Sequence, residues 1–121
     1  MVDLSLIKRF TVVGAGTMGR EIAQVALMSD MFDKVILNDI NENALNNAKK
    51  FIKLGIEKIE SKGKLGQGLT TLSLINNLII DKNLTNSVKE ADFIVEAIPE
   101  VMELKQDLFK ELGNMRQNML Y

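Results

Sequence analysis

The sequence predicts one α/β domain in which a parallel sheet carries helices on both faces. Two observations predict this class. Short runs of β-branched and apolar residues alternate along the chain with longer segments whose apolar residues recur at helical spacing. The first apolar run also ends in a cluster of glycines that is followed at once by a helical pattern. Strands that alternate with helices form parallel sheets, because each connecting helix returns the chain by a right-handed crossover.

The first two strand–helix pairs are expected at residues 8–13 with 17–29, and at residues 34–38 with 42–60. Both strands are mostly apolar, which is typical of strands that are buried on both faces. Asn41 is placed to cap the first turn of the second helix. The inward-facing candidates of the first helix are Met18, Ile22, Val25 and Ala26. The apolar stripe of the second helix consists of Leu45, Ala48, Ile52, Ile56 and Ile59.

The remaining chain is expected to add two more strands. The glycine-rich stretch 61–68 argues against regular structure there, and Pro99 ends the last strand. In order, the expected elements are a short helix at 70–76, a strand at 77–80, a short helix or turn at 85–90, a strand at 92–98 and a helix at 100–112. The expected strand order is 3-2-1-4, with a ligand beyond the carboxyl ends of strands 1 and 4. A complete six-stranded sheet of this type needs two further strands, so the sheet is expected to be incomplete.

The glycines after the first strand, Gly14, Gly16 and Gly19, form the pattern G-x-G-x-x-G. Alone the pattern is a weak signal, since glycine-rich loops are common. Between a buried strand and a helix it is the fingerprint of a dinucleotide site, because the glycines allow a tight turn, a close approach of a pyrophosphate and close packing of the helix. The phosphates then lie on free N–H groups at the positive end of the helix. The loop therefore predicts a Rossmann-type nucleotide site.

Asp39 ends the second strand, twenty residues after Gly19. A carboxylate at this position can accept hydrogen bonds from both hydroxyls of the adenosine ribose. It also repels a 2′-phosphate, and no arginine follows it closely, so the position favours NAD over NADP. The alternative is an aspartate that only caps the following helix.

The composition excludes several other classes. Fifteen cationic and sixteen anionic residues give a net charge of −1, so neither nucleic acid nor an anionic membrane is an expected partner. The sequence shows no signal-peptide pattern and no apolar run of membrane-spanning length, and a cytoplasmic protein is expected. Cysteine and histidine are absent, so no metal site is expected and the usual general base is missing.

Five segments together resemble the L-3-hydroxyacyl-CoA dehydrogenase family. The glycine motif is shared with many dehydrogenases, whereas the last two segments are much more particular to this family. The segments are V-G-A-G-T-M-G at 13–19, N-D at 38–39, K-G-K at 62–64, A-D-F-I-V-E-A-I-P-E at 91–100 and K-Q-D-L-F at 105–109. Their order and spacing match the family over roughly residues 8–112, and the resemblance implies that residues 1–121 are an N-terminal NAD-binding domain.

The resemblance also implies roles for individual residues. Asp39 matches the carboxylate that binds the adenosine ribose, and Lys62 matches a lysine that meets the phosphates of coenzyme A, although an exposed loop lysine fits as well. The positions that match the pyrophosphate site are Gly14, Ala15, Gly16, Thr17, Met18 and Gly19. The positions that match contacts near the nicotinamide half are Ala97, Ile98, Glu100 and Lys105. From the residues alone, a structural role is as good an explanation for both charged residues as a functional one. Glu100 fits an acid in the first turn of its helix, stabilised by the helix dipole, and Lys105 fits a solvated surface lysine.

Other parts of the family pattern have no counterpart in this sequence. These are the next strand, a histidine–glutamate catalytic pair and a helical C-terminal domain. Removal of the 3-hydroxyl proton needs a base, so the chain alone is expected to hold NAD without turning over an acyl-CoA, and no catalytic residue is expected in it. Two alternatives are an NAD-dependent dehydrogenase of the gulonate or 3-hydroxyisobutyrate type and an NAD-binding module without chemistry. A sheet that stops at its fourth strand has a bare edge, where we expect self-association.

Overall fold

The computed structural model describes residues 7–97, and its elements follow the predicted order. In chain order they are β1 (Arg9–Val13), α1 (Thr17–Met28), β2 (Lys34–Asn38), α2 (Glu42–Ser61), α3 (Thr71–Ile75), β3 (Leu78–Asp81), α4 (Leu84–Lys89) and β4 (Phe93–Glu96). The expected helix at 100–112 and Ile98, the last residue expected in the fourth strand, lie outside the described residues.

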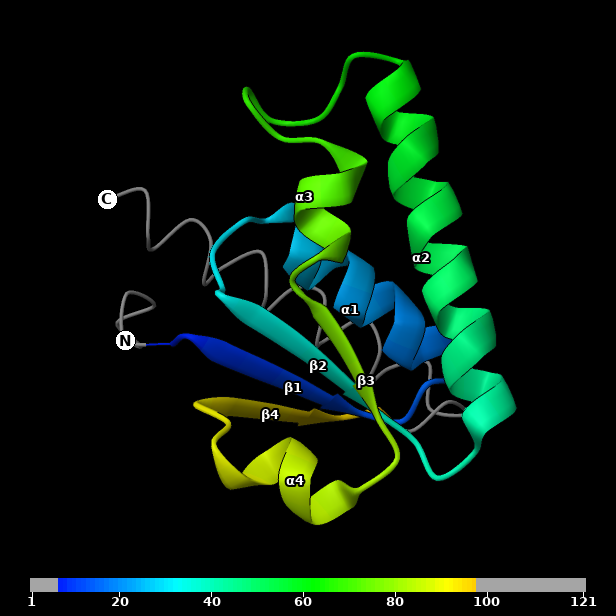
Figure 1. Cartoon of the computed structure of the whole chain (residues 1–121), viewed down its shortest axis with the longest axis vertical. Coiled ribbons are helices and arrows are strands. Elements are labelled where there is room, and N and C mark those ends of the chain that lie inside the picture. Colours follow the sequence, from blue (N-terminus) through cyan, green and yellow to red (C-terminus); the bar gives the residue numbers. More distant parts are fainter. Residues whose placement is uncertain (1–6, 98–121) are drawn as a thin grey trace.

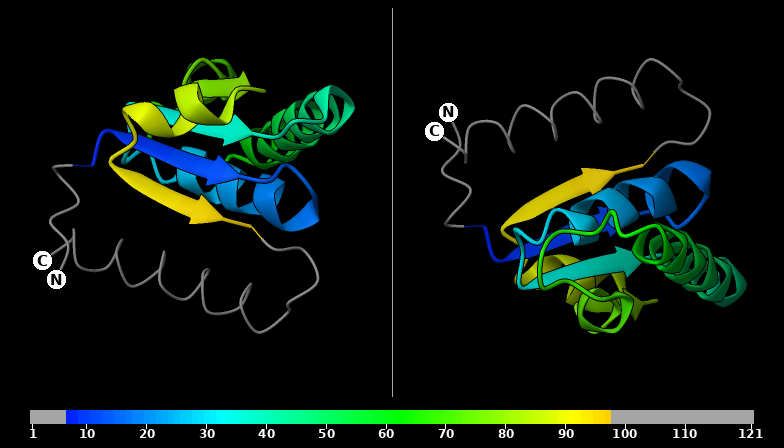
Figure 2. Two further views of the ribbon diagram at one scale, coloured as in Figure 1. Left: turned by 90° about the horizontal axis from the view of Figure 1, so that it is seen from below. Right: turned by 90° about the horizontal axis from the view of Figure 1, so that it is seen from above.

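The four strands form one parallel sheet in the order β3-β2-β1-β4, as predicted. Figure 2 shows the four arrows pointing the same way. Val13 of β1 is in register with Asn38 of β2 and Glu96 of β4, and Asn38 is in register with Asp81 of β3. The loops that leave the carboxyl ends of the strands therefore start at one edge of the sheet, where ligands bind in folds of this type.

Helices cover both faces of the sheet, as predicted. In Figure 1, α1, α2 and α3 lie on one face and α4 lies on the other. The first face holds the main apolar core, in which Phe10 and Val12 of β1 are fully buried. Helices α1 and α2 complete this core with buried residues that include Ile22, Ala26, Leu45, Ile52 and Ile56. The α1–α2 side thus supplies most of the hydrophobic stabilisation of the fold.

The α4 face is held by buried hydrogen bonds. The Thr11 hydroxyl donates to the Ser87 carbonyl oxygen at 2.8 Å. The Asn38 amide nitrogen donates to the Asp81 carbonyl oxygen at 2.9 Å and to the Ser87 hydroxyl at 3.1 Å. Because buried polar groups need partners, the two bonds to Ser87 fix α4 to β1 and β2. The bond to Asp81 anchors the end of β2 directly before Asp39.

Most predicted boundaries are correct to within one or two residues, and the differences have local causes. The third strand begins one residue later than predicted because the Asn77 N–H donates to the Leu74 carbonyl in a turn. Asn41 is the N-cap of α2, as predicted, and its side chain accepts from the Ala44 N–H. The prediction that Val25 faces the core is wrong: its side chain is 42% exposed, on the outer flank of α1.

The start of β4 is joined to the start of β1 through Asp92. One carboxylate oxygen of Asp92 accepts from the Lys8 N–H at 2.7 Å and from the Arg9 N–H at 2.9 Å. The hydrogen bond from the Arg9 N–H, followed by that from the Lys8 N–H, holds the pKa of Asp92 below its ordinary value of 3.8. Within the described part of the chain, no helix is both long enough and apolar enough to cross a membrane.

Candidate nucleotide site

The first turn of the glycine loop needs glycine for two reasons. Gly14 has φ of +107°, which side chains rarely tolerate. A Cβ at this position would also lie 3.0 Å from the Ala97 carbonyl oxygen. The Gly14 N–H donates to the Asn38 carbonyl at 2.7 Å, so the loop starts tied to the end of β2. The predicted role of Gly14 as a tight turn agrees with this geometry.

Gly19 is the point where α1 passes over its own loop. A Cβ built on Gly19 would overlap the carbonyl oxygen of Gly14 and would lie 3.5 Å from the Ala97 side chain. Ala97, far away in sequence, therefore lies beside Gly14 and Gly19 at the carboxyl ends of β1 and β4. The structure brings Ala97 to the glycine loop, whereas Ile98, Glu100 and Lys105 lie outside the described residues.

The N-terminus of α1 is left open by its sequence. Gly16 is the N-cap, no side chain caps the helix, and the first turn carries no acidic residue. The other helices that the structure describes are each capped by a side chain, from Asn41, Thr70 and Asn83. The first N–H groups of a helix have no partner inside it and carry a partial positive charge. This end of α1 therefore fits an anion such as a pyrophosphate.

The individual loop residues contribute in different ways. Gly16 and Thr17 are exposed, and a Cβ on Gly16 would meet no atom within 4 Å, so the space in front of the helix is open. Met18 has its side chain buried in the core, at 2% exposure, and can offer a ligand only its main chain. The Ala15 N–H is engaged by Asp39.

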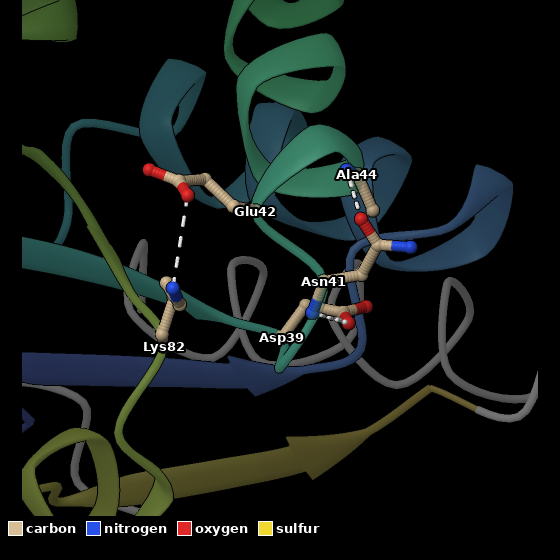
Figure 3. Close-up of polar contacts among 5 residues, drawn as sticks. All are labelled: Asp39, Asn41, Glu42, Ala44 and Lys82. Atoms are coloured by element: carbon tan, nitrogen blue, oxygen red, sulfur yellow. Dashed lines mark hydrogen bonds and ion pairs between the residues drawn. The ribbon is translucent and has the colours of Figure 1, made fainter.

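Asp39 lies at the centre of the hydrogen bonds beside the loop. Its Oδ2 accepts from the Ala15 N–H at 2.9 Å, and its Oδ1 accepts from the Asn41 N–H at 2.8 Å. The helix cap is Asn41, as Figure 3 shows, so the alternative in which Asp39 caps α2 is not what the structure has. A carboxylate offers about four acceptor positions, so about two are left for hydroxyl groups of a ribose.

These features together fit an adenine dinucleotide. The open end of α1 suits the pyrophosphate, and the half-buried Asp39 suits the ribose at the end of the neighbouring strand. The bond between Ala15 and Asp39 fixes the two parts of the site relative to each other.

Lys62 lies far from this site. It follows the last residue of α2, whereas Asp39 lies three residues before the first. A helix of 20 residues is about 30 Å long, and Figure 1 shows α2 leading away from the arrowhead of β2. The exposed Lys62 therefore belongs to a different part of the surface from the glycine loop.

Two charged residues beside Asp39 were not predicted from the sequence. Glu42 is the first residue of α2, and Lys82 directly follows β3. The Lys82 Nζ lies 3.7 Å from the Glu42 Oε2 (Figure 3). The sequence does show that Lys82 directly follows β3, as Asp39 directly follows β2. The pairing of Lys82 with Glu42 depends in addition on the register between β2 and β3, which the sequence does not show.

The comparisons with known proteins agree with this geometry. The family described as "3-hydroxyacyl-CoA dehydrogenase, NAD binding domain" matches residues 9–120. A probable 3-hydroxyacyl-CoA dehydrogenase of Caenorhabditis elegans is 32% identical over 114 residues, which cover 91% of this chain and 36% of the relative. A probable 3-hydroxybutyryl-CoA dehydrogenase of Deinococcus radiodurans is 37% identical over 107 residues, covering 88% of this chain and 37% of the relative.

A solved structure gives the same result for the fold. The crystal structure of 3-hydroxybutyryl-CoA dehydrogenase from Escherichia coli K12 aligns with a TM-score of 0.68 and 31% identity, covering 90% of this chain and 22% of that chain. The chain spans little more than a third of the curated relatives named above.

Proposed function

Since this chain belongs to the 3-hydroxyacyl-CoA dehydrogenase family through its NAD-binding domain, we propose that it is the cofactor-binding part of an enzyme that oxidises L-3-hydroxyacyl-CoA to 3-oxoacyl-CoA. The substrate class includes 3-hydroxybutyryl-CoA, and the reaction serves fatty-acid metabolism. The observation that carries the proposal is the carboxylate of Asp39, bonded at 2.9 Å to the backbone of the glycine loop and next to the open end of α1.

Each part of the site has a defined task in this proposal. The N–H groups of the exposed residues Gly16 and Thr17 bind the pyrophosphate, and the remaining acceptor positions of Asp39 bind the adenosine ribose. NAD, when bound, supplies the acceptor for the hydride that leaves the substrate. The Ala97 N–H donates to the Val13 carbonyl at 2.9 Å and holds the ends of β1 and β4 together, beside the expected position of the nicotinamide half.

The proposal gives this chain binding and orientation, and leaves proton transfer to residues beyond it. The sequence contains no histidine, and an acid or base that works near neutral pH is needed to take the hydroxyl proton. We therefore expect the 121-residue chain to bind NAD without producing NADH from an acyl-CoA. Acyl-CoA, with its phosphates at Lys62, and a cytoplasmic location are further parts of the proposal.

Two measurements test the proposed function. Calorimetry on the 121-residue chain should show NAD binding, and the longer protein that continues this sequence should form NADH from L-3-hydroxybutyryl-CoA and NAD. The D-enantiomer is the control, since it presents the hydrogen on the opposite side of the carbon. Failure to bind NAD would remove the cofactor site, whereas binding without NADH formation across acyl lengths would favour another hydroxyacid dehydrogenase or a module without chemistry.

A further inference from the structure

Asp39 has two charged neighbours that the proposed function does not use. Asn38 and Asp81 are in register, so Asp39 and Lys82 leave neighbouring parallel strands at the same level. The Asp39 N–H donates to the Asp81 carbonyl at 3.4 Å, which keeps the two chain segments together. Glu42 begins the helix that follows Asp39. Figure 3 shows Asp39, Glu42 and Lys82 grouped around the turn between β2 and α2.

The space beside Glu42 and Lys82 is large enough for a phosphate group, although Asp39 is not among the residues that line it. A hollow of about 300 Å³ lies between the first turns of α2 and the end of β3, lined by Glu42, Leu45, Asn46, Ile80, Asp81 and Lys82. The side chains of Glu42 and Lys82 are 69% and 57% exposed. Shape alone therefore gives little discrimination between a ribose hydroxyl and a ribose phosphate, and charge must provide it.

We propose that Glu42 is a second residue, after Asp39, that determines the preference for NAD over NADP. The inference rests on the proposed binding of NAD. Lys82 is a cation well placed to attract a 2′-phosphate, and Glu42 counteracts it in two ways. The carboxylate pairs with Lys82 at 3.7 Å, and it adds a negative charge three residues after Asp39, on the side of the turn toward Lys82. A phosphate that extends from the ribose toward this hollow meets the carboxylate of Glu42 and a cation that is already paired with it.

An ordinary surface ion pair is the competing interpretation, and the same helix provides a matched control. Lys53 and Glu57 of α2 lie 4.0 Å apart, with side chains 59% and 46% exposed. This pair resembles Glu42–Lys82 in chemistry and exposure but does not adjoin Asp39. Exposed pairs of this type contribute little to stability, so neither glutamate is expected to be needed for folding.

The test compares binding of NAD and NADP to four forms of the 121-residue chain by calorimetry at low ionic strength. The forms are the wild type, Glu42→Gln, Glu57→Gln and the double variant Glu42→Gln with Lys82→Met. We expect Glu42→Gln to strengthen NADP binding by about threefold to tenfold, with NAD binding unchanged, as Coulomb interactions across several ångströms of water predict. Added salt should reduce the gain. The double variant should lose most of the gain in NADP affinity, and Glu57→Gln should show no gain.

The possible results separate the inference from the proposed function. Two results would overturn the role of Glu42 and leave the proposed function intact. One is NAD binding with an unchanged ratio of NADP affinity to NAD affinity in Glu42→Gln, and the other is an equal gain in NADP affinity in Glu57→Gln. A wild-type chain that binds neither dinucleotide would overturn the proposed function and this inference with it. Thermal unfolding of each variant checks that a lost signal reflects the site and not a lost fold.

Discussion

Single atoms decide the shape of the glycine loop. The Gly14 carbonyl oxygen occupies the place where a Cβ of Gly19 would be, and Gly16 faces open space. The spacing of the three glycines predicted these separate roles, because each role follows from the geometry of a strand that turns into a helix. The same motif could not reveal that the Ala15 N–H binds Asp39, since that contact depends on the turn after β2.

Alanine at Gly19 and at Gly16 should separate folding from cofactor binding. Gly19→Ala forces a Cβ into a backbone carbonyl, so we expect destabilisation at or above the upper end of the about 1–3 kcal/mol typical of overpacking. The Cβ added by Gly16→Ala would meet no atom within 4 Å. This variant should therefore keep the melting temperature of the wild type while its affinity for NAD falls. Thermal unfolding and calorimetry measure the two effects. Equal melting temperatures for both variants would contradict the prediction.

Asp39→Ala should lower the affinity for NAD much more than the affinity for NADP. Hydrogen bonds to a charged group contribute about 1.5–3 kcal/mol, which corresponds to a loss of about tenfold to hundredfold in NAD affinity. The loss for NADP should be smaller because its 2′-phosphate is repelled by this carboxylate. Asp33→Ala is the control for the lost negative charge, since Asp33 is exposed and directly precedes β2, at the opposite end of the strand from Asp39. Equal losses for both cofactors, measured by calorimetry, would exclude the ribose role.

The sequence predicted the secondary-structure elements correctly where one local signal dominated. The strand at 34–38 was predicted with its final bounds, and Asn41 as a cap fixed the start of α2. Segments where tertiary contacts compete were less predictable. Val25 fits a helical apolar pattern, yet it lies on a flank of α1 that no described element covers closely enough to bury it. The polar seam of Thr11, Asn38 and Ser87 depends on how α4 crosses the sheet, which no local pattern contains.

The link between β1 and β4 should depend on pH through Asp92. The bonds from the Arg9 and Lys8 N–H groups lower the pKa of Asp92 in the folded state. Its contribution to stability is therefore present above the unfolded pKa, near 3.8, and is lost as the pH falls through the lower folded value. Asp92→Asn should remove this component of acid sensitivity, as seen by denaturant unfolding at pH about 3 and 6. Asp33→Asn controls for the change in net charge, and an identical pH profile for the two variants would contradict the prediction.

The topology of the whole molecule was predictable, whereas distances between its parts were not. Alternation of strands and helices, with the handedness of crossovers, leads directly to the order β3-β2-β1-β4. The remote position of Lys62 depends on the direction in which α2 leaves the sheet, and the residues expected near nicotinamide beyond Ala97 lie outside the described part. The structure therefore describes more of the residues predicted for the adenosine half of the site than of those predicted for the nicotinamide half.

We expect the chain to self-associate through the edge of the sheet at β4. In the described part of the chain β4 pairs with β1 on one side, and Ile94 is 45% exposed on the α4 face. Unpaired strand edges tend to pair with other chains. Light scattering over a range of concentrations should show a rising mass, and Ile94→Lys should reduce it by placing a charge at the edge. A uniform monomer at high concentration would count against this expectation.

If Lys62 meets coenzyme A as proposed, the length of α2 makes it a spacer between two binding functions. Each helical turn advances the chain by about 5.4 Å, so inserting or deleting one turn in the exposed part of α2 moves Lys62 by that distance and leaves the glycine loop in place. Affinity for the substrate then becomes adjustable through the spacer, independently of affinity for NAD. The two halves of such a site can then diverge separately among relatives, with the nucleotide loop kept and the reach of the helix varied.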